Sequence, residues 1–439
     1  GVDRAVLSTD DPSVYRYDQM DTNSSENSSM QMGTNSTAYY FSVASSSIAN
    51  FFDEMYLNTP WEQHYNNLDG RTILDCLASV KYFVVKKGEE SDLPYGYSRL
   101  SGEAEKKGKT YLAYADEDAL PLGYTYDSWI SREDYDKMTV TEKQQALLQG
   151  VVLDDSSLPE TETHFNDREV SYYTSEGKGC RLKNGKVVVT QENAQLKLVF
   201  EGEENAETYL ITEGLDYEGL SPREMISDKK WSKMTTYEQN KLLEENSNWR
   251  YWKESQKASI QLEGHFLRKS IQIFTDKYNA YSGKHNFLCN TGYSEKGRHT
   301  ITLTFENTGV YSFDSLKICC QPMTELDSQT RKLGEEVLTD VKVGNNEING
   351  NISLSDAKAL VLSIPYSEGW TAYVDGEKTE LKEANTMYMA LELPKGDHEI
   401  HLVYCTLYLG TGLCLTCIGV LCYIVLVLIN KKKKRFQKS

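Results

Sequence analysis

Apolar and polar residues alternate with a period of two along much of the chain after residue 180. Seven short runs carry this pattern, at residues 187–189, 196–200, 207–212, 258–262, 270–274, 299–305 and 315–319. Because successive side chains of a strand point to opposite faces of its sheet, the pattern predicts half-buried β-strands. Their number and spacing predict an antiparallel β-sandwich of jelly-roll-like topology over residues 178–336, with a helical insertion near residues 216–256.

The alternation continues in residues 337–404 and predicts a further β unit there, with a turn at Asp375-Gly376. The N-terminal part differs, because residues 71–81 have apolar residues at helical spacing and residues 82–85 form a short buried strand. Residues 1–118 therefore predict a small α/β extracytoplasmic unit, which includes a loosely structured Ser/Asn-rich loop at residues 21–47. The predicted fold class is α+β, made predominantly of antiparallel β-sandwich domains.

Residues 130–147 are repeated at residues 226–243. Each copy contains Met-Thr-x-x-Glu before a Leu, which is the capping-box sequence: the Thr hydroxyl accepts from the third helical amide, and the Glu carboxylate accepts from the Thr amide. We expect a short surface helix in each copy, acting as support for the chain. The first copy makes residues 119–177 a connector of helices and loops.

One segment, Leu407 to Ile429, has 23 residues without a charge. As a helix it would be about 35 Å long, which exceeds the roughly 30 Å of a bilayer's hydrocarbon core. Five consecutive cations, residues 431–435, follow it directly. By the positive-inside rule, we expect residues 405–430 to form a transmembrane helix, residues 431–439 a basic cytoplasmic tail, and residues 1–403 to lie outside the cell membrane.

Exporting such a body ahead of a C-terminal span requires an earlier signal sequence or membrane segment. The chain opens GVDRAVLSTD, without Met and without an apolar run. We therefore expect that Gly1 is not the natural start. Either a signal peptide has been removed, or the chain is the last part of a longer polypeptide with several spans.

Composition and charge restrict the class of protein. The 439 residues suffice for two or three packed domains, and 48 aromatic residues with only nine prolines exclude a collagen-like or disordered chain. Residues 1–403 hold 41 Lys and Arg against 65 Asp and Glu, a balance of −24. So acidic a body argues against nucleic acid as a partner.

The sequence contains no recognisable catalytic motif: no Gly-x-Ser-x-Gly elbow, phosphate loop, dinucleotide fingerprint or His-Glu-x-x-His. His398 and His401 lie three apart on a predicted strand, so they point to opposite faces and do not share a metal ion. We therefore assign no catalytic residue, no metal ligand and no cofactor from the residues themselves.

The 30 tyrosines and six tryptophans are more informative. Exposed aromatic rings on β-sandwiches stack on the CH faces of sugars while neighbouring polar groups bind the hydroxyls. The candidate carbohydrate-binding residues are Tyr124, Tyr126, Trp129, Tyr366 and Trp370. The alternative is that these rings pack in sheet cores.

Several stretches together resemble the C-terminal extracytoplasmic part of the bacterial YfhO family of membrane proteins. They are residues 71–82 (RTILDCLASVKY), 120–126 (LPLGYTY) with the Met-Thr-x-x-Glu helix after them, 362–376 (LSIPYSEGWTAYVDG) and 393–400 (LPKGDHEI), followed by the final span and its basic tail. The resemblance covers nearly the whole chain, in order.

The resemblance implies a polytopic glycosyltransferase of the GT-C type. Such enzymes take a sugar from a polyprenyl-phosphate carrier and transfer it outside the membrane, with cell-envelope glycans such as teichoic acid as implied acceptors. Their catalytic carboxylate lies among N-terminal membrane helices, so no catalytic residue transfers to this chain, which would be inactive without that membrane module. The competing interpretation is a non-enzymatic, membrane-anchored protein that binds or scaffolds surface glycans.

Overall fold

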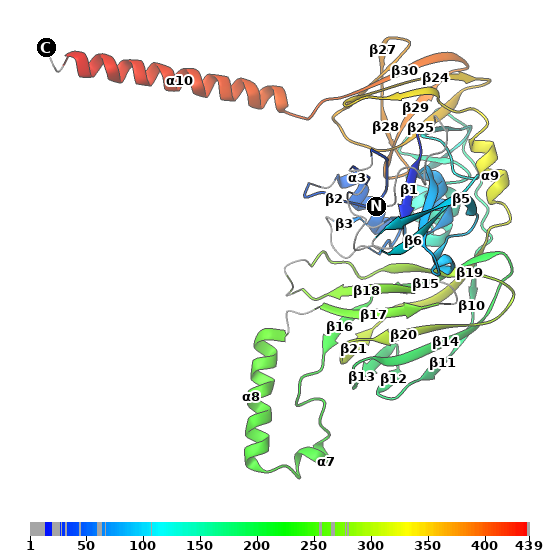
Figure 1. Cartoon of the computed structure of the whole chain (residues 1–439), viewed down its shortest axis with the longest axis vertical. Coiled ribbons are helices and arrows are strands. Elements are labelled where there is room, and N and C mark those ends of the chain that lie inside the picture. The colour runs from blue at the N-terminus through cyan, green and yellow to red at the C-terminus, as the bar shows by residue number, and fades with distance from the viewer. Residues whose placement is uncertain are drawn as a thin grey trace.

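The computed structural model describes residues 14–436 except for residues 20–26, 28, 31–32, 44, 59–63, 66, 107, 254–256, 265–267, 277 and 279–280. In Figure 1 two β-rich parts lie at the ends of the long axis, and the N-terminal segment of the chain lies between them. The last helix, α10 (Leu409–Phe436), extends away from one β-rich part, and an arm containing α7 and α8 projects from the other. The predominantly antiparallel β fold with one C-terminal apolar helix is confirmed.

The β-rich part between residues 168 and 322 contains three sheets. The first has the order β10 (Arg168–Val170), β22 (Ser315–Pro322), β15 (Ala206–Glu213), β19 (Phe287–Ser294). The second has the order β11 (Tyr172–Glu176), β14 (Ala194–Gly202), β20 (Gly297–Phe305), β17 (Lys257–Glu263), β18 (Arg268–Phe274). The third, smaller sheet has the order β12 (Cys180–Lys183), β13 (Lys186–Val189), β21 (Gly309–Ser312), β16 (Asp216–Gly219).

These sheets share one apolar cluster because the period-two pattern directs alternate side chains inward. On β14, for example, Leu196 and Leu198 are buried whereas Gln195 and Lys197 are exposed. All seven predicted strands are present. The arm, with α7 (Asp228–Trp231) and α8 (Thr236–Lys253), occupies the expected insertion. The jelly-roll topology stays a prediction.

The C-terminal β unit has two sheets around a second apolar cluster. One has the order β23 (Thr339–Val343), β24 (Glu347–Leu354), β30 (Gly396–Tyr404), β26 (Trp370–Val374), β27 (Glu377–Thr379). The other has the order β28 (Lys382–Ala384), β29 (Tyr388–Leu393), β25 (Lys358–Pro365), β7 (Gly123–Tyr126). Strand β7 comes from the segment that we predicted to be a connector, so this sheet joins residues more than 230 positions apart.

The N-terminal part contains a mixed sheet in the order β1 (Arg16–Gln19), β4 (Val80–Lys86), β6 (Lys109–Ala115), β5 (Ser98–Lys106). Its other elements are β2 (Tyr39–Tyr40), α3 (Ser46–Glu54), β3 (His64–Tyr65), α4 (Thr72–Leu77) and the 3-10 turn η1 (Glu90–Asp92). The predicted helix and strand of residues 71–85 are thus present. Side chains of α3 and α4 share a third apolar cluster with residues beyond position 118, so the domain boundary predicted there stays a prediction.

The two repeat copies have the same local structure but different surroundings. The first contains β8 (Trp129–Ser131), α5 (Arg132–Asp136) and α6 (Val140–Ala146), and β9 (Val151–Leu153) follows it. The remaining described helix of the body, outside the repeat, is α9 (Leu326–Leu333). The capping boxes of Thr139 with Glu142 and of Thr235 with Glu238 are both present. However, α6 is largely buried, which corrects our expectation of a surface helix, whereas α8 is mainly exposed.

Helix α4 carries a buried carboxyl group that has no hydrogen-bond partner among the described residues. Asp75 is 0% exposed, and neither of its side-chain oxygens has such a partner. Burial, with smaller contributions from the nearby carboxylates of Asp18 and Glu207, raises the pKa of Asp75 well above its ordinary value. The protonated form is therefore the one that the folded chain accommodates.

Replacing Asp75 with asparagine is expected to stabilise the protein more at pH 8 than at pH 5. Folding raises the pKa of Asp75. The contribution of Asp75 to the stability of the folded state is therefore complete below the unfolded pKa of about 4 and is lost as the pH rises through the folded pKa. The loss is about 1.4 kcal/mol per unit of difference between the two pKa values. Melting temperatures of both proteins at the two pH values test this. The exposed Asp356→Asn variant is the control, and an equal or lower melting temperature for Asp75→Asn at pH 8 would contradict the prediction.

Candidate functional site

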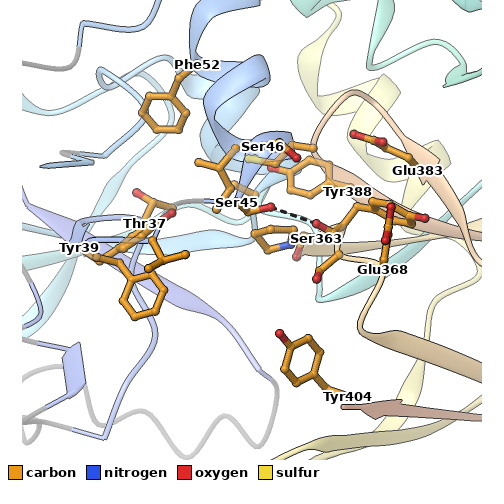
Figure 2. Close-up of a pocket in the computed structure, with 18 of the residues that line it drawn as sticks. Thr37, Tyr39, Ser45, Ser46, Phe52, Ser363, Glu368, Glu383, Tyr388 and Tyr404 are labelled. Carbon is orange, nitrogen blue, oxygen red and sulfur yellow. Dashed lines mark hydrogen bonds between the residues drawn. The ribbon is translucent and has the colours of Figure 1, made fainter. Parts of the chain in front are cut away.

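A cleft of about 1090 Å³ lies next to the start of α10. One wall comes from the N-terminal segment: Thr37, Tyr39, Phe41, Val43, Ser45 and Ser46. The other wall comes from the C-terminal β unit: Ser363, Tyr366, Glu368, Glu383, Tyr388 and Tyr404, with Leu407 at the start of the apolar segment. Figure 2 shows Thr37 and Tyr39 on one side of this cleft and Glu368 and Glu383 on the other.

Hydrogen bonds from α3 hold the two walls together. The hydroxyls of Ser45 and Ser47 donate to the carbonyl oxygen of Tyr366 at 3.2 and 3.0 Å. Helix α3 can lie this close because Ile48, Phe51 and Phe52 are buried on one of its faces. The Ser-rich start of the helix thus positions the turn that follows β25.

The floor of the cleft is polar. The Arg16 guanidinium donates to the carbonyl oxygens of Ala78 and Ser363, both at 2.6 Å, and to the Ser363 hydroxyl at 3.0 Å. Burial lowers the pKa of Arg16, but an arginine starting at 12.5 stays charged at neutral pH. Behind it, burial raises the pKa of Asp18 to about 6, opposed by hydrogen bonds from Thr37 and Ser36.

Aromatic rings line the rest of the cleft. Tyr39 stacks on Tyr65 with ring centroids 4.9 Å apart, and burial raises the pKa of its hydroxyl. Tyr404 packs against Trp370, with centroids 5.2 Å apart and ring planes at 59°. Tyr366 is half-buried, and burial raises its pKa as well. Rings beside carboxylates and hydroxyls suit a ligand that has both CH faces and hydroxyl groups.

Of the five predicted carbohydrate-binding residues, Tyr366 lines this cleft. Trp370 does not line it but packs against Tyr404, which does. Trp129 is half-buried and lines a separate hollow of about 410 Å³ together with Asp134 and His164, so its role stays a prediction.

Tyr124 and Tyr126 correct our expectation of exposed rings. They are 0% and 1% exposed, and their hydroxyls donate to the carbonyl oxygens of Leu77 at 3.1 Å and Leu147 at 2.6 Å. Both rings belong to the apolar cluster that also contains residues of α3 and α4, because β7 pairs with β25 inside the body of the chain. They are core residues, which is the alternative that we had left open.

Sequence reasoning missed the N-terminal wall. Residues 21–47 were expected to be a loose loop, and of these the structure describes 27, 29–30, 33–43 and 45–47. A signal was present, because no charged residue occurs between Glu26 and Asp53 although Tyr39, Tyr40 and Phe41 form an aromatic run. Within the described part of the chain, no group of three or more His, Cys, Asp or Glu side chains could hold a metal ion.

Comparisons with known proteins agree with the resemblance. A family model described as "Bacterial membrane protein YfhO" matches residues 2–416. The "Uncharacterized protein YfhO" of Bacillus subtilis is 22% identical over 407 residues, which cover 91% of this chain and 42% of the relative. The chain therefore spans less than half the length of that curated relative.

Solved structures show only faint likeness. Cryo-EM structures of the arabinofuranosyltransferase AftD from mycobacteria are among the matches, and two of them illustrate the likeness. One has 16% identity and a TM-score of 0.15 and covers 34% of this chain and 12% of AftD; the other has 8% identity and a TM-score of 0.16 and covers 57% and 28%. At such TM-scores neither structure supports an inference about this chain.

Proposed function

The chain belongs to the YfhO family of bacterial membrane proteins, and on this premise we propose that it is the exported part of a membrane glycosyltransferase whose cleft holds a cell-envelope glycan. The observation that carries the proposal is the position and lining of the cleft. Aromatic rings, hydroxyls and carboxylates line the cleft (Figure 2), and so does Leu407, two residues before α10. Among the described residues, α10 is the one helix long and apolar enough to cross a membrane.

The size and chemistry of the cleft favour the acceptor glycan as its ligand. Ligand pockets usually measure about 300–1,000 Å³, so about 1090 Å³ admits more than one sugar unit. Tyr39, Tyr366 and Tyr404 offer faces for sugar rings, and Glu368 and Glu383 offer acceptors for their hydroxyls.

The charge of the cleft lining determines which part of the acceptor glycan fits. Glu368 and Glu383 line the cleft, and the body of the chain carries −24. The Arg16 guanidinium donates to Ala78 and Ser363. A hydroxyl-rich, uncharged stretch of an envelope polymer such as teichoic acid therefore fits better than its phosphates.

This proposal places the sugar donor and the catalytic groups outside the chain. In this proposal a polyprenyl-phosphate-linked sugar is bound by a membrane module outside these residues, since the chain spans only 42% of its curated relative. In this arrangement residues 1–403 lie outside the cell, and the cleft holds the acceptor hydroxyls at the membrane surface where that donor is presented.

Replacing Tyr366 with alanine is expected to weaken binding of purified envelope glycan by about 5-fold, because one stacked ring contributes roughly 1 kcal/mol. Binding is measured by retention of the detergent-solubilised chain on immobilised glycan. Trp129→Ala, in the separate hollow, is the matched comparison, and a loss with Trp129→Ala alone would move the site to that hollow.

The same two variants, introduced into the encoding gene, separate the enzyme from the glycan-binding alternative. Disruption of the gene should remove one sugar from the hydrolysed envelope polymers, and Tyr366→Ala should reduce that sugar. If binding falls while the sugar content of a disrupted strain is unchanged, the non-enzymatic scaffold is the better description.

A further inference from the structure

Exposed apolar side chains gather at the mouth of the cleft. Phe41 is 58% and Val43 75% exposed, and both line the cleft together with Leu407, which is 46% exposed. Single exposed apolar residues are common on protein surfaces, but exposed apolar residues grouped at one place mark a contact surface. We call Phe41, Val43 and Leu407 the apolar lip.

The start of the membrane helix determines where the apolar lip lies relative to the bilayer. The apolar segment of α10, Leu409–Lys431, has 23 residues. As a helix it is about 35 Å long, so its first residue lies at the boundary of a hydrocarbon core of roughly 30 Å. Leu407 lies two residues earlier, which is at most about 7 Å away and within the headgroup layer.

The remaining lip residues are held near Leu407 by the cleft that they share. Tyr366, also in this cleft, is bound by Ser45 and Ser47 at the start of α3, two residues beyond Val43. The backbone amide of Cys405 donates to the Gly369 carbonyl oxygen at 2.9 Å, which fixes the chain that leads into α10 to the same turn. In Figure 1, β2 and α3 lie on the side of the body from which α10 extends.

We propose that Phe41 and Val43 insert into the outer leaflet and form a second membrane contact, so that the cleft opens onto the bilayer surface. The occupant of this surface is a phospholipid bilayer. The lack of charge between residues 27 and 52 suits the interface. Tyr40 and Tyr408, the exposed sequence neighbours of Phe41 and Leu407, are of the residue type that forms the aromatic belt of membrane proteins. The proposal holds whether or not the cleft binds a glycan.

Site-specific photo-crosslinking to lipid tests the insertion. The full chain, including α10, is reconstituted in vesicles of phosphatidylethanolamine and phosphatidylglycerol, with p-benzoylphenylalanine replacing Phe41 or Val43. Both side chains are exposed, so the replacement leaves the core intact. After irradiation, intact-protein mass spectrometry should show lipid adducts at positions 41 and 43.

Two further positions make the result decisive. Tyr173 on β11 is 50% exposed and lies in the β-rich part far from α10, so the same label there should give several-fold less adduct. Leu413 within α10 confirms that the chain is inserted. Adducts at position 413 with none at positions 41 and 43, or with equal amounts at 41, 43 and 173, would overturn the proposal. Because no glycan is present, this failure would leave the proposed transferase function untouched.

Discussion

If the chain acts in sugar transfer as we propose, replacing Ser46 with tryptophan is expected to reduce that transfer by about 100-fold, because displacing a reacting group by about 1 Å is enough for a loss of this size. Ser46 is the first residue of α3, is exposed, and lines the cleft. An indole at this position would fill space that the acceptor needs. The measurement is the incorporation of the transferred sugar into envelope polymers by cells that carry the change in the encoding gene.

The matched control for this blockage lies on the same helix. Asn50 is exposed on α3 but does not line the cleft, so Asn50→Trp should leave sugar incorporation near that of the unchanged protein. Equal melting temperatures of the two variants would show that the fold is intact. Full activity of Ser46→Trp, or an equal loss in both variants, would mean that the cleft is not used during transfer.

Replacing Arg71 with methionine is expected to lower the free energy of unfolding by about 3–5 kcal/mol, the usual cost of removing one member of a buried charged network. Arg71 is 0% exposed. Its Nε donates to the Gln144 side-chain oxygen at 2.8 Å, and its Nη1 donates to the Met55 carbonyl oxygen at 2.5 Å. The residue therefore ties the segments around α3, α4 and α6 together.

The loss is large because the remaining groups stay buried without their donor. The Gln144 side-chain oxygen loses both hydrogen bonds from Arg71, and the buried Glu207 loses the nearby positive charge that opposes the rise of its pKa. Chemical denaturation of the solubilised chain, followed by circular dichroism, measures the effect. Arg181→Met, at an exposed position on β12, should change the unfolding free energy by less than about 0.5 kcal/mol. A similarly small change for Arg71→Met would show that the network is not structural.

Local patterns predicted the elements well. The strands after residue 180 were predicted because each alternates apolar and polar residues over its own short length, as in β14. The capping boxes of Thr139 and Thr235 formed as expected, since both of their hydrogen bonds lie within four residues. The apolar segment of α10 was equally clear, because its signal is composition alone.

Burial and the candidate site followed less closely from the sequence. Tyr124 and Tyr366 were equivalent candidates in the sequence, yet one is core and the other lines the cleft. The difference arises because β7 pairs with β25, at residues far away in the chain. Likewise α6 is buried and α8 is mainly exposed although both carry the same capping motif, since α6 lies against α4 whereas α8 is on the arm that projects from the body (Figure 1).

The sequence alone therefore determined the features that depend on composition or on residues close in the chain. These are the alternating strands, the helix caps, the hydrophobic span and the acidic charge of the body. The cleft depended on tertiary structure, because its walls are brought together from residues about 320 positions apart by hydrogen bonds such as Ser47 to Tyr366. Periodicity reports which face of an element is apolar, but it carries no information about which distant element will cover that face. The position of the apolar lip beside α10 likewise depends on tertiary structure, because it results from packing between the N-terminal and C-terminal parts of the chain.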